Sequence, residues 1–133
     1  MIVVDSSVWI DFLNGRATPE VDLLRDLLGA QPLLVGDVIL LEVLQGVRSE
    51  AEARRVEAAL RRFELHSMLT PDLAVLAAAH YRRLRVLGVP VRKTVDLIIG
   101  TFCIARDYVL LTSDRDFLPM AHSLGLKLAK PDM

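Results

Sequence analysis

The sequence predicts an α/β fold of three layers, in which a central, mostly parallel sheet of about five short strands is flanked by helices. Two observations support this prediction. Short apolar runs, typical of strands covered on both faces, alternate with segments whose apolar residues recur at helical spacing. Such alternation implies right-handed crossovers between parallel strands. At 133 residues, the chain fits a single domain that spans residues 1–133.

The predicted strands are short segments with few polar residues: 2–4, 33–35, 65–69, 108–112 and 126–129. The first, second and fourth are almost wholly apolar, which suits the centre of a parallel sheet. The last, at 126–129, is expected at an edge of the sheet. The first strand ends abruptly at Asp5, where the chain turns into its first helix.

Capping signals place the helices between these strands. Ser6 and Ser7 can cap the first helix. Thr18 followed by Pro19 predicts the start of a second helix, and Gly29 predicts its end. Later helices are expected after Gly36–Asp37, Ser49 (with Glu52 at capping-box spacing), Thr70–Pro71 and Thr94. In the helix after Thr70, the predicted shared face comprises Leu73, Leu76, Ala77, His80 and Leu84.

The composition limits the possible functions. It is 53% hydrophobic and 25% charged, which is typical of a globular protein and excludes a disordered chain. The net charge of −1 indicates that any nucleic-acid contact comes from a local basic patch. The single cysteine, Cys103, excludes an internal disulfide and a cysteine-based zinc site, and its apolar setting suggests a buried thiol. No apolar run approaches the ~20 residues that cross a bilayer, so we expect a cytoplasmic protein without membrane contact.

Acidic residues follow the strands and open the helices at one predicted edge of the sheet. Asp5 follows the first strand and Asp114 and Asp116 the fourth, while Asp96 lies in the first turn expected after Thr94. In open α/β sheets this edge is where ligands bind. Each acid alone could be a cap, a first-turn acid or a turn residue. Glu42, inside an apolar helix pattern, has about even odds of facing solvent.

Several carboxylates at one edge raise one another's pKa unless a cation neutralises them. Mg²⁺ suits such a site because it prefers oxygen ligands, and it can promote phosphodiester hydrolysis with one ion or with two. Zinc is disfavoured because the histidines have no ligand-like spacing, and His80 is more typical of a satisfied core histidine. The sequence therefore predicts an acidic, Mg²⁺-binding cleft.

Four motifs in order resemble those of the PIN-domain ribonucleases, specifically the VapC toxins of toxin–antitoxin pairs. They are VVDSSVWIDFL, ILLEVLQG, TVDLIIG and LLTSDRDF, and the resemblance covers nearly the whole chain. It implies a three-layer PIN-like fold and a Mg²⁺- or Mn²⁺-dependent endoribonuclease that cuts tRNA, rRNA or mRNA. It also implies inhibition by a small VapB antitoxin, bound beside or within the acidic cleft, and a homodimer able to join a larger assembly.

The resemblance also implies a role for each acid. Asp5 and Asp96 would bind the metal directly, and Asp114 directly or through water. Glu42 would orient a water or act as a base, and Asp116 would be a peripheral helper. The four catalytic acids of this reading are therefore Asp5, Glu42, Asp96 and Asp114.

Other polar residues are expected to support these acids. Ser6 and Thr112 could hydrogen-bond the carboxylates or the substrate, although a local cap or turn bond is at least as good a reading. Arg92, Lys93 and Arg115 are the expected RNA phosphate contacts, because chain order places them at the same edge. Arginines elsewhere are expected to be solvated helix charges: Arg54, Arg55, Arg61 and Arg62.

Two alternatives remain open at this point. One is a housekeeping PIN nuclease in RNA processing, and the other is a catalytically inactive α/β binding module. A haloacid-dehalogenase-like hydrolase fits less well, because Ser7 stands where that family needs its second Asp.

Overall fold

The computed structural model describes residues 1–131, so the last two residues of the predicted domain, 132–133, lie outside the described residues. Its sheet has five strands, in the order β3-β2-β1-β4-β5, and every neighbouring pair is parallel. The strands are β1 (Ile2–Val4), β2 (Leu33–Gly36), β3 (Glu64–His66), β4 (Val109–Leu111) and β5 (Lys127–Leu128). The predicted parallel sheet is confirmed, with its last strand at an edge.

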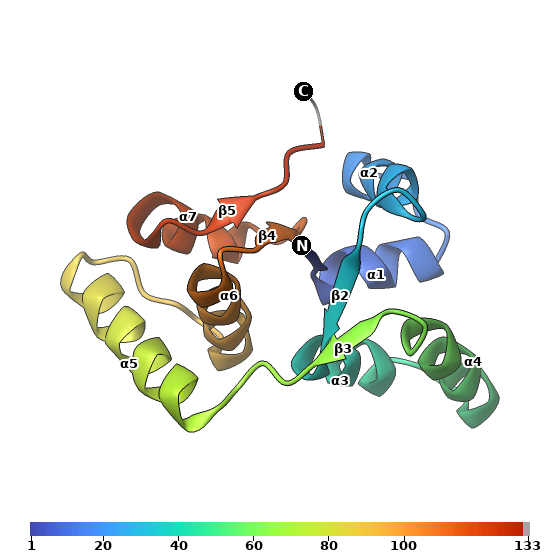
Figure 1. The fold of residues 1–133 in the computed structure, drawn as a ribbon, viewed down its shortest axis with the longest axis horizontal. Coiled ribbons are helices and arrows are strands. Elements are labelled where there is room, and N and C mark those ends of the chain that lie inside the picture. The colour runs from blue at the N-terminus through green and yellow to red at the C-terminus, as the bar shows by residue number, and fades with distance from the viewer. Residues whose placement is uncertain (132–133) are drawn as a thin grey trace.

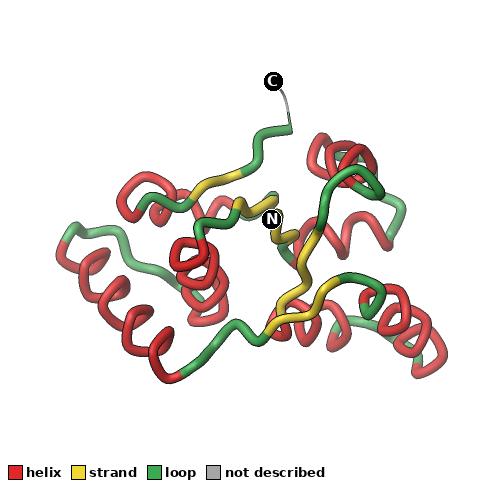
Figure 2. Tube along the Cα trace, in the orientation of Figure 1, coloured by secondary structure: helices red, strands yellow, loops and turns green. Residues whose placement is uncertain are grey.

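Helices cover both faces of the sheet, which confirms the three-layer arrangement (Figures 1 and 2). The helices α1 to α4 lie to one side of the strands in Figure 1, and α5 to α7 lie to the other. In chain order they are α1 (Ser6–Leu13), α2 (Pro19–Leu27), α3 (Asp37–Gln45), α4 (Glu50–Leu60), α5 (Pro71–Val86), α6 (Thr94–Arg106) and α7 (Leu118–Leu124), with a 3₁₀ turn η1 (Arg115–Phe117) before α7.

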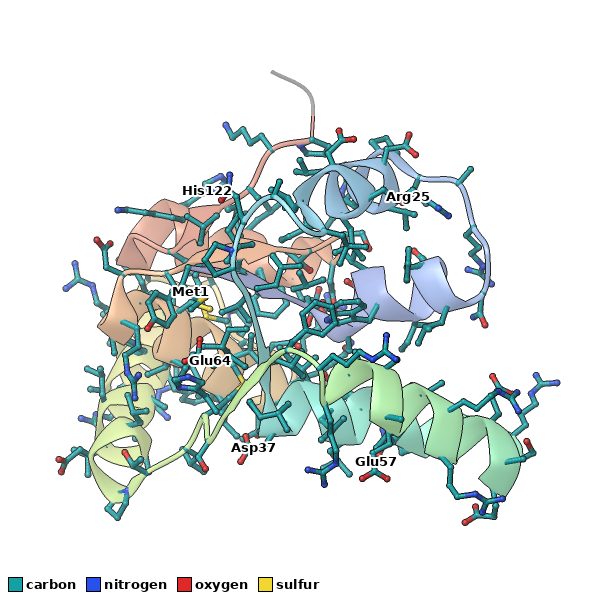
Figure 3. The ribbon with its side chains drawn as sticks, turned by 45° about the vertical axis from the view of Figure 1, so that its right-hand side comes forward. Met1, Arg25, Asp37, Glu57, Glu64 and His122 are labelled. Carbon is teal, nitrogen blue, oxygen red and sulfur yellow. The ribbon has the colours of Figure 1, made fainter. Side chains whose placement is uncertain are left out.

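The core lies on both sides of the three central strands. Val3, Val4, Leu34, Leu110 and Leu111 have no exposed surface, as expected of apolar strands between two helical layers. Side chains fill the space around the sheet (Figure 3). Helix α6 is the most deeply buried helix, with these buried residues: Asp96, Leu97, Ile99, Gly100, Thr101, Phe102 and Cys103.

Three predicted helix starts are confirmed by hydrogen bonds of the cap side chains. The hydroxyls of Thr18, Ser49 and Thr70 accept the backbone N–H three residues later, at 3.0, 3.2 and 3.2 Å. These bonds satisfy amides that the helix itself leaves unpaired.

Two predicted caps are wrong. Asp5, rather than Ser6 or Ser7, caps α1, because its backbone is still extended and its carboxylate accepts Ser7 N–H at 3.4 Å. Helix α6 already includes Thr94, and its N-cap is Lys93, whose side chain makes no capping bond. In both helices the last extended residue lies one or two positions earlier than the hydroxyl pattern indicated.

Other predicted boundaries and faces differ in detail. The third strand begins and ends earlier than 65–69, at Glu64–His66, and the fourth is shorter than 108–112. Leu76, expected on the shared apolar face of α5, is 36% exposed. The reason is that α5 is an outer helix that buries only a narrow stripe, including Ala77 and Leu84, against its neighbours.

Candidate metal centre

The strands are added to the sheet on one side of β1 first and on its other side later. The connection from β1 leads to β2 on one side, while β4 pairs with β1 on the other side. The carboxyl ends of β1 and β4 therefore lie beside a topological switch point, where open α/β sheets bind ligands. Asp5 follows β1 directly, and its backbone N–H donates to the carbonyl of Leu111 in β4 at 2.9 Å.

The carboxylate of Asp5 is held by two hydroxyl groups. Its Oδ2 accepts hydrogen bonds from Ser7 Oγ at 2.6 Å and from Thr112 Oγ1 at 2.9 Å. Asp5 itself is only 3% exposed. Burial raises the pKa of Asp5, whereas the two hydroxyl bonds oppose that rise by stabilising the charged form. The hydroxyls thus fix the orientation of a buried acid.

The same hydroxyls position the loop after β4. Thr112 Oγ1 accepts the N–H of Asp114 at 3.0 Å, and Ser7 Oγ accepts the N–H of Ser113 at 3.3 Å. Thr112 was expected to support the acids, and the structure places it between two of them. For Ser7 the sequence predicts only a helix cap. Its contact with the loop joins residues 106 positions apart, and such a distant contact leaves no signal in the sequence.

Three aspartates gather next to Asp5. Carboxylate oxygens of Asp96, Asp114 and Asp116, one from each, lie within 4.8 Å of one another. Asp114 also caps η1 by accepting the N–H of Asp116 at 2.9 Å. Asp96 comes from the first turn of α6, is 4% exposed, and its Oδ2 has no hydrogen-bond partner. We refer to Asp96, Asp114 and Asp116 as the aspartate trio.

Glu42 on α3 faces the same site. Its Oε1 accepts Ser6 Oγ at 2.9 Å, so the solvent-facing alternative does not describe it. Partial burial raises the pKa of Glu42, and the charges of Asp5 and Asp114 add to this effect. Ser6, like Thr112, therefore has the carboxylate contact that was considered for it.

The pKa of Asp96 shows how unfavourable the concentration of acids is. Burial raises it from 3.8 to about 7, with further increases from Asp114 and Asp5 and an opposing effect from Lys93. An isolated buried charge without a partner is costly. The arrangement therefore favours either a protonated Asp96 or a bound cation.

Basic side chains surround this acidic centre. Lys93 Nζ lies 3.7 Å from Asp114 Oδ2 and 3.9 Å from Asp116 Oδ2. Arg92 and Arg115 line a hollow of about 340 Å³ whose wall also includes Asp116. The three residues expected to contact phosphates thus lie at the edge that carries the acids.

The structure places the expected site residues at one edge but changes which acids are nearest one another. The expected metal ligands were Asp5, Asp96 and Asp114, whereas the tightest group contains Asp116 in place of Asp5. Asp5 still lies within electrostatic reach, since its charge raises the pKa of both Asp96 and Glu42. Sequence spacing gave no means of ranking the aspartates on either side of Arg115.

Cys103 and His80, which lie outside the centre, have the environments of structural residues rather than of catalytic ones. Cys103 is buried, and burial raises the pKa of its thiol to about 12, which makes it a poor nucleophile. His80 Nδ1 lies 3.1 Å from Thr101 Oγ1, in agreement with a satisfied histidine. Within residues 1–131, no helix is both long and apolar enough to cross a membrane.

Comparison with known proteins identifies the family. The PIN domain family model matches residues 2–122. The chain belongs to the PIN-domain family. The resemblance to PIN domains that the four motifs indicated is therefore confirmed, and PIN domains are nucleases.

Solved structures from toxin–antitoxin complexes share the fold of this PIN domain. One match is a chain of VapBC2 from Rickettsia felis, in a complex with a DNA fragment from the VapBC2 promoter. Its TM-score is 0.77 and its sequence identity 16%, and the match covers 97% of this chain and 98% of that chain. VapBC-1 from nontypeable Haemophilus influenzae gives 0.77 and 16%, covering 100% of both chains. A toxin–antitoxin complex from Klebsiella pneumoniae gives 0.73 and 20%, covering 98% of each.

Proposed function

We propose that this PIN domain is an endoribonuclease whose aspartate trio, together with Asp5, holds Mg²⁺, with Mn²⁺ as a substitute. The observation that carries the proposal is the unpaired Oδ2 of Asp96, buried beside two other carboxylates. A divalent cation would supply the missing partner. The donors are all carboxylate oxygens, a set that suits hard ions such as Mg²⁺ better than zinc, which prefers sites with His or Cys ligands.

The residues around the ion would divide the remaining tasks. When bound, the ion would polarise a phosphate and lower the pKa of a water. Glu42, with its raised pKa and its bond from Ser6, is placed to accept a proton from the attacking water. Ser7 and Thr112 would keep Asp5 oriented, so their roles are positional.

The RNA strand would pass over the basic side of the centre. Arg92 and Arg115 are exposed and share a hollow with Asp116, so a phosphate held there would be adjacent to the trio. Such contacts position a strand without selecting its bases. The reaction would therefore require the RNA substrate to present a phosphate at this edge. That substrate could be single-stranded RNA, tRNA, rRNA or mRNA.

We further propose that the domain is the toxin of a cytoplasmic toxin–antitoxin pair, since chains with this fold come from such complexes. A hollow of about 380 Å³ between α1, α3 and α4, with apolar residues and the polar Asn14, Arg48 and Glu52 in its lining, is a suitable surface for the antitoxin. Its lining includes Ile10 and Leu13, both partly exposed, and α3 also carries Glu42. An antitoxin segment bound there would lie beside the acidic centre.

The homodimer is a separate proposal. Exposed apolar side chains on the outer face of α5 and just after it form a surface that a second copy could cover: Val75, Leu76, Val86 and Leu87. Sedimentation velocity of the wild-type protein and of Val86→Glu tests this. A dimer that dissociates in the variant supports the surface, whereas a monomeric wild type contradicts it.

The decisive experiment for the nuclease is RNA cleavage by purified protein with Mg²⁺, with EDTA, and with an Asp96→Asn variant. We expect cleavage only by the wild-type protein with Mg²⁺. Sequencing of RNA ends in cells that express the wild type or Asp96→Asn would then identify the cut sites. Equal cleavage under all three conditions would indicate a contaminating nuclease and would remove the enzymatic proposal.

The antitoxin proposal has its own test. Any small protein encoded beside this gene is co-expressed with the domain, and co-purification is measured. Ile10→Lys with Leu13→Lys should abolish co-purification and restore toxicity, whereas Leu69→Lys, at an exposed residue just before α5, should change neither. Absence of a small neighbouring gene would instead favour a housekeeping nuclease.

A further inference from the structure

One cationic side chain lies at the rim of the acidic centre. Lys93 Nζ is 3.7 Å from Asp114 and 3.9 Å from Asp116. Among residues 1–131, no other lysine or arginine forms an ion pair with the trio, Asp5 or Glu42.

Helix stability does not explain a lysine at this position. Lys93 is the N-cap of α6, where the helix dipole disfavours a positive charge and favours an acceptor such as Ser or Asp. Its side chain makes no capping bond and is 59% exposed. The acids are therefore the partners that hold the ammonium group near the end of α6.

We propose that Lys93 is an internal counter-ion of the metal-free site, which a divalent cation displaces so that the ammonium group becomes available to an RNA phosphate. This inference rests on the proposed metal centre. It assigns Lys93 two successive partners, the carboxylates without metal and the phosphate with it, whereas Arg92 and Arg115 would contact phosphate only.

The distances support displacement. A Mg²⁺ ion lies about 2.0–2.1 Å from its ligand oxygens, so an ion on Asp114 Oδ2 or Asp116 Oδ2 would lie no more than about 6 Å from the ammonium group in its present position, where the two positive charges repel. Both Lys93 contacts are longer than a hydrogen bond, which indicates weakly held pairs. The exposed side chain can turn outward without any change in the backbone of α6.

Lys93 also leaves the neutralisation incomplete. It pairs with Asp114 and Asp116, but Asp96 Oδ2 remains without a partner. A single positive charge at the rim therefore balances part of the trio and leaves the buried oxygen for a second cation. A divalent cation that bound Asp96 Oδ2 together with Asp114 or Asp116 would compete with Lys93 for the oxygens of those two residues.

The test measures Mn²⁺ affinity without any turnover, by electron paramagnetic resonance of free Mn²⁺ during titration. Lys93→Gln should bind Mn²⁺ about three- to tenfold more tightly than the wild type, because one competing positive charge is gone. Arg92→Gln, one residue away with the same charge change, should differ by less than twofold. Lys93→Arg should resemble the wild type.

RNA binding completes the test, measured by fluorescence anisotropy of a labelled 12-nucleotide RNA with Ca²⁺ in place of Mg²⁺. Lys93→Gln should weaken RNA binding while strengthening Mn²⁺ binding. Equal Mn²⁺ affinity in Lys93→Gln and Arg92→Gln, or weaker Mn²⁺ binding in Lys93→Gln, would overturn the role of Lys93 alone. No Mn²⁺ binding by the wild type would overturn the metal centre as well.

Discussion

At the scale of single residues, the acids of the centre differ in whether a hydroxyl group holds the carboxylate. Asp5 is oriented by the hydroxyls of Ser7 and Thr112, and Glu42 by that of Ser6. Asp96 differs from both, since one of its oxygens is buried without a partner. The buried acid with an unpartnered oxygen is therefore the one that most needs an external cation.

Asp96 makes the stability of the metal-free protein depend on pH. Its pKa is about 7 in the folded protein and near 3.8 when unfolded, so the folded state binds more protons between these values. The free energy of unfolding should therefore fall as pH rises from about 4 to about 7. Urea denaturation in EDTA at pH 5 and pH 8 should show a smaller fall for Asp96→Asn. The same fall in both proteins would contradict this assignment.

Thr112 joins Asp5 to the loop that carries Asp114. Thr112→Val keeps the shape but removes one donor to a carboxylate and one acceptor of a backbone N–H. We expect the free energy of unfolding to decrease by about 1–3 kcal/mol, because buried polar groups lose their partners. Urea denaturation measures this, and Thr112→Ser, which keeps the hydroxyl, is the control. An undiminished stability of Thr112→Val would show that this bond is unimportant.

At the scale of elements, two short segments deliver the aspartate trio. The first turn of α6 supplies Asp96 from a buried helix, and η1 supplies Asp116 just after Asp114. Phe117, the last residue of η1, has no exposed surface and fixes this short turn to the core. The position of two carboxylates thus depends on one aromatic side chain.

Phe117→Ala should lower the free energy of unfolding by about 3–5 kcal/mol, because it leaves a cavity in the core. Urea denaturation followed by circular dichroism measures the change. Leu118→Ala, at the next and 39% exposed residue, should cost only about 0.5 kcal/mol. Similar losses in the two variants would mean that η1 is not anchored through Phe117.

At the scale of the whole molecule, the strand order determines where the chemistry is located. Because β1 lies between β2 and β4, residues that follow the first and fourth strands meet at one edge. Basic residues from the segment before α6 and from η1 border the same edge. A protein with a net charge of −1 can in this way present positive charge to RNA locally.

The salt dependence of RNA binding tests this local charge. Arg92→Ala should weaken binding and reduce the slope of log K against log salt by about 0.7, the value for one phosphate contact on a single strand. Arg54→Ala, on the exposed side of α4, should leave the slope unchanged. Anisotropy titrations at about 50 to 300 mM KCl would measure both slopes. The Debye length falls from about 14 to about 6 Å over this range. An unchanged slope for Arg92→Ala would remove it from the RNA contacts.

The sequence by itself determined the fold class, the approximate strands and the identity of the acids. Apolar runs such as residues 2–4 and 109–111 are predictable because burial on both faces tolerates few polar side chains. The caps at Thr18, Ser49 and Thr70 are equally local, since each depends on a hydrogen bond three residues away. The acids stood out because each interrupts or follows an apolar pattern.

Only the tertiary structure decided how these acids are arranged. The bond from Thr112 to Asp5 joins residues 107 apart, and that from Ser6 to Glu42 joins residues 36 apart. The closest group of carboxylates contains Asp116 rather than Asp5, and Lys93 lies near two of its members. Both facts likewise depend on how α6 and η1 pack against β1 and β4. Such contacts leave no periodic signal in the sequence, because they arise between elements rather than within them.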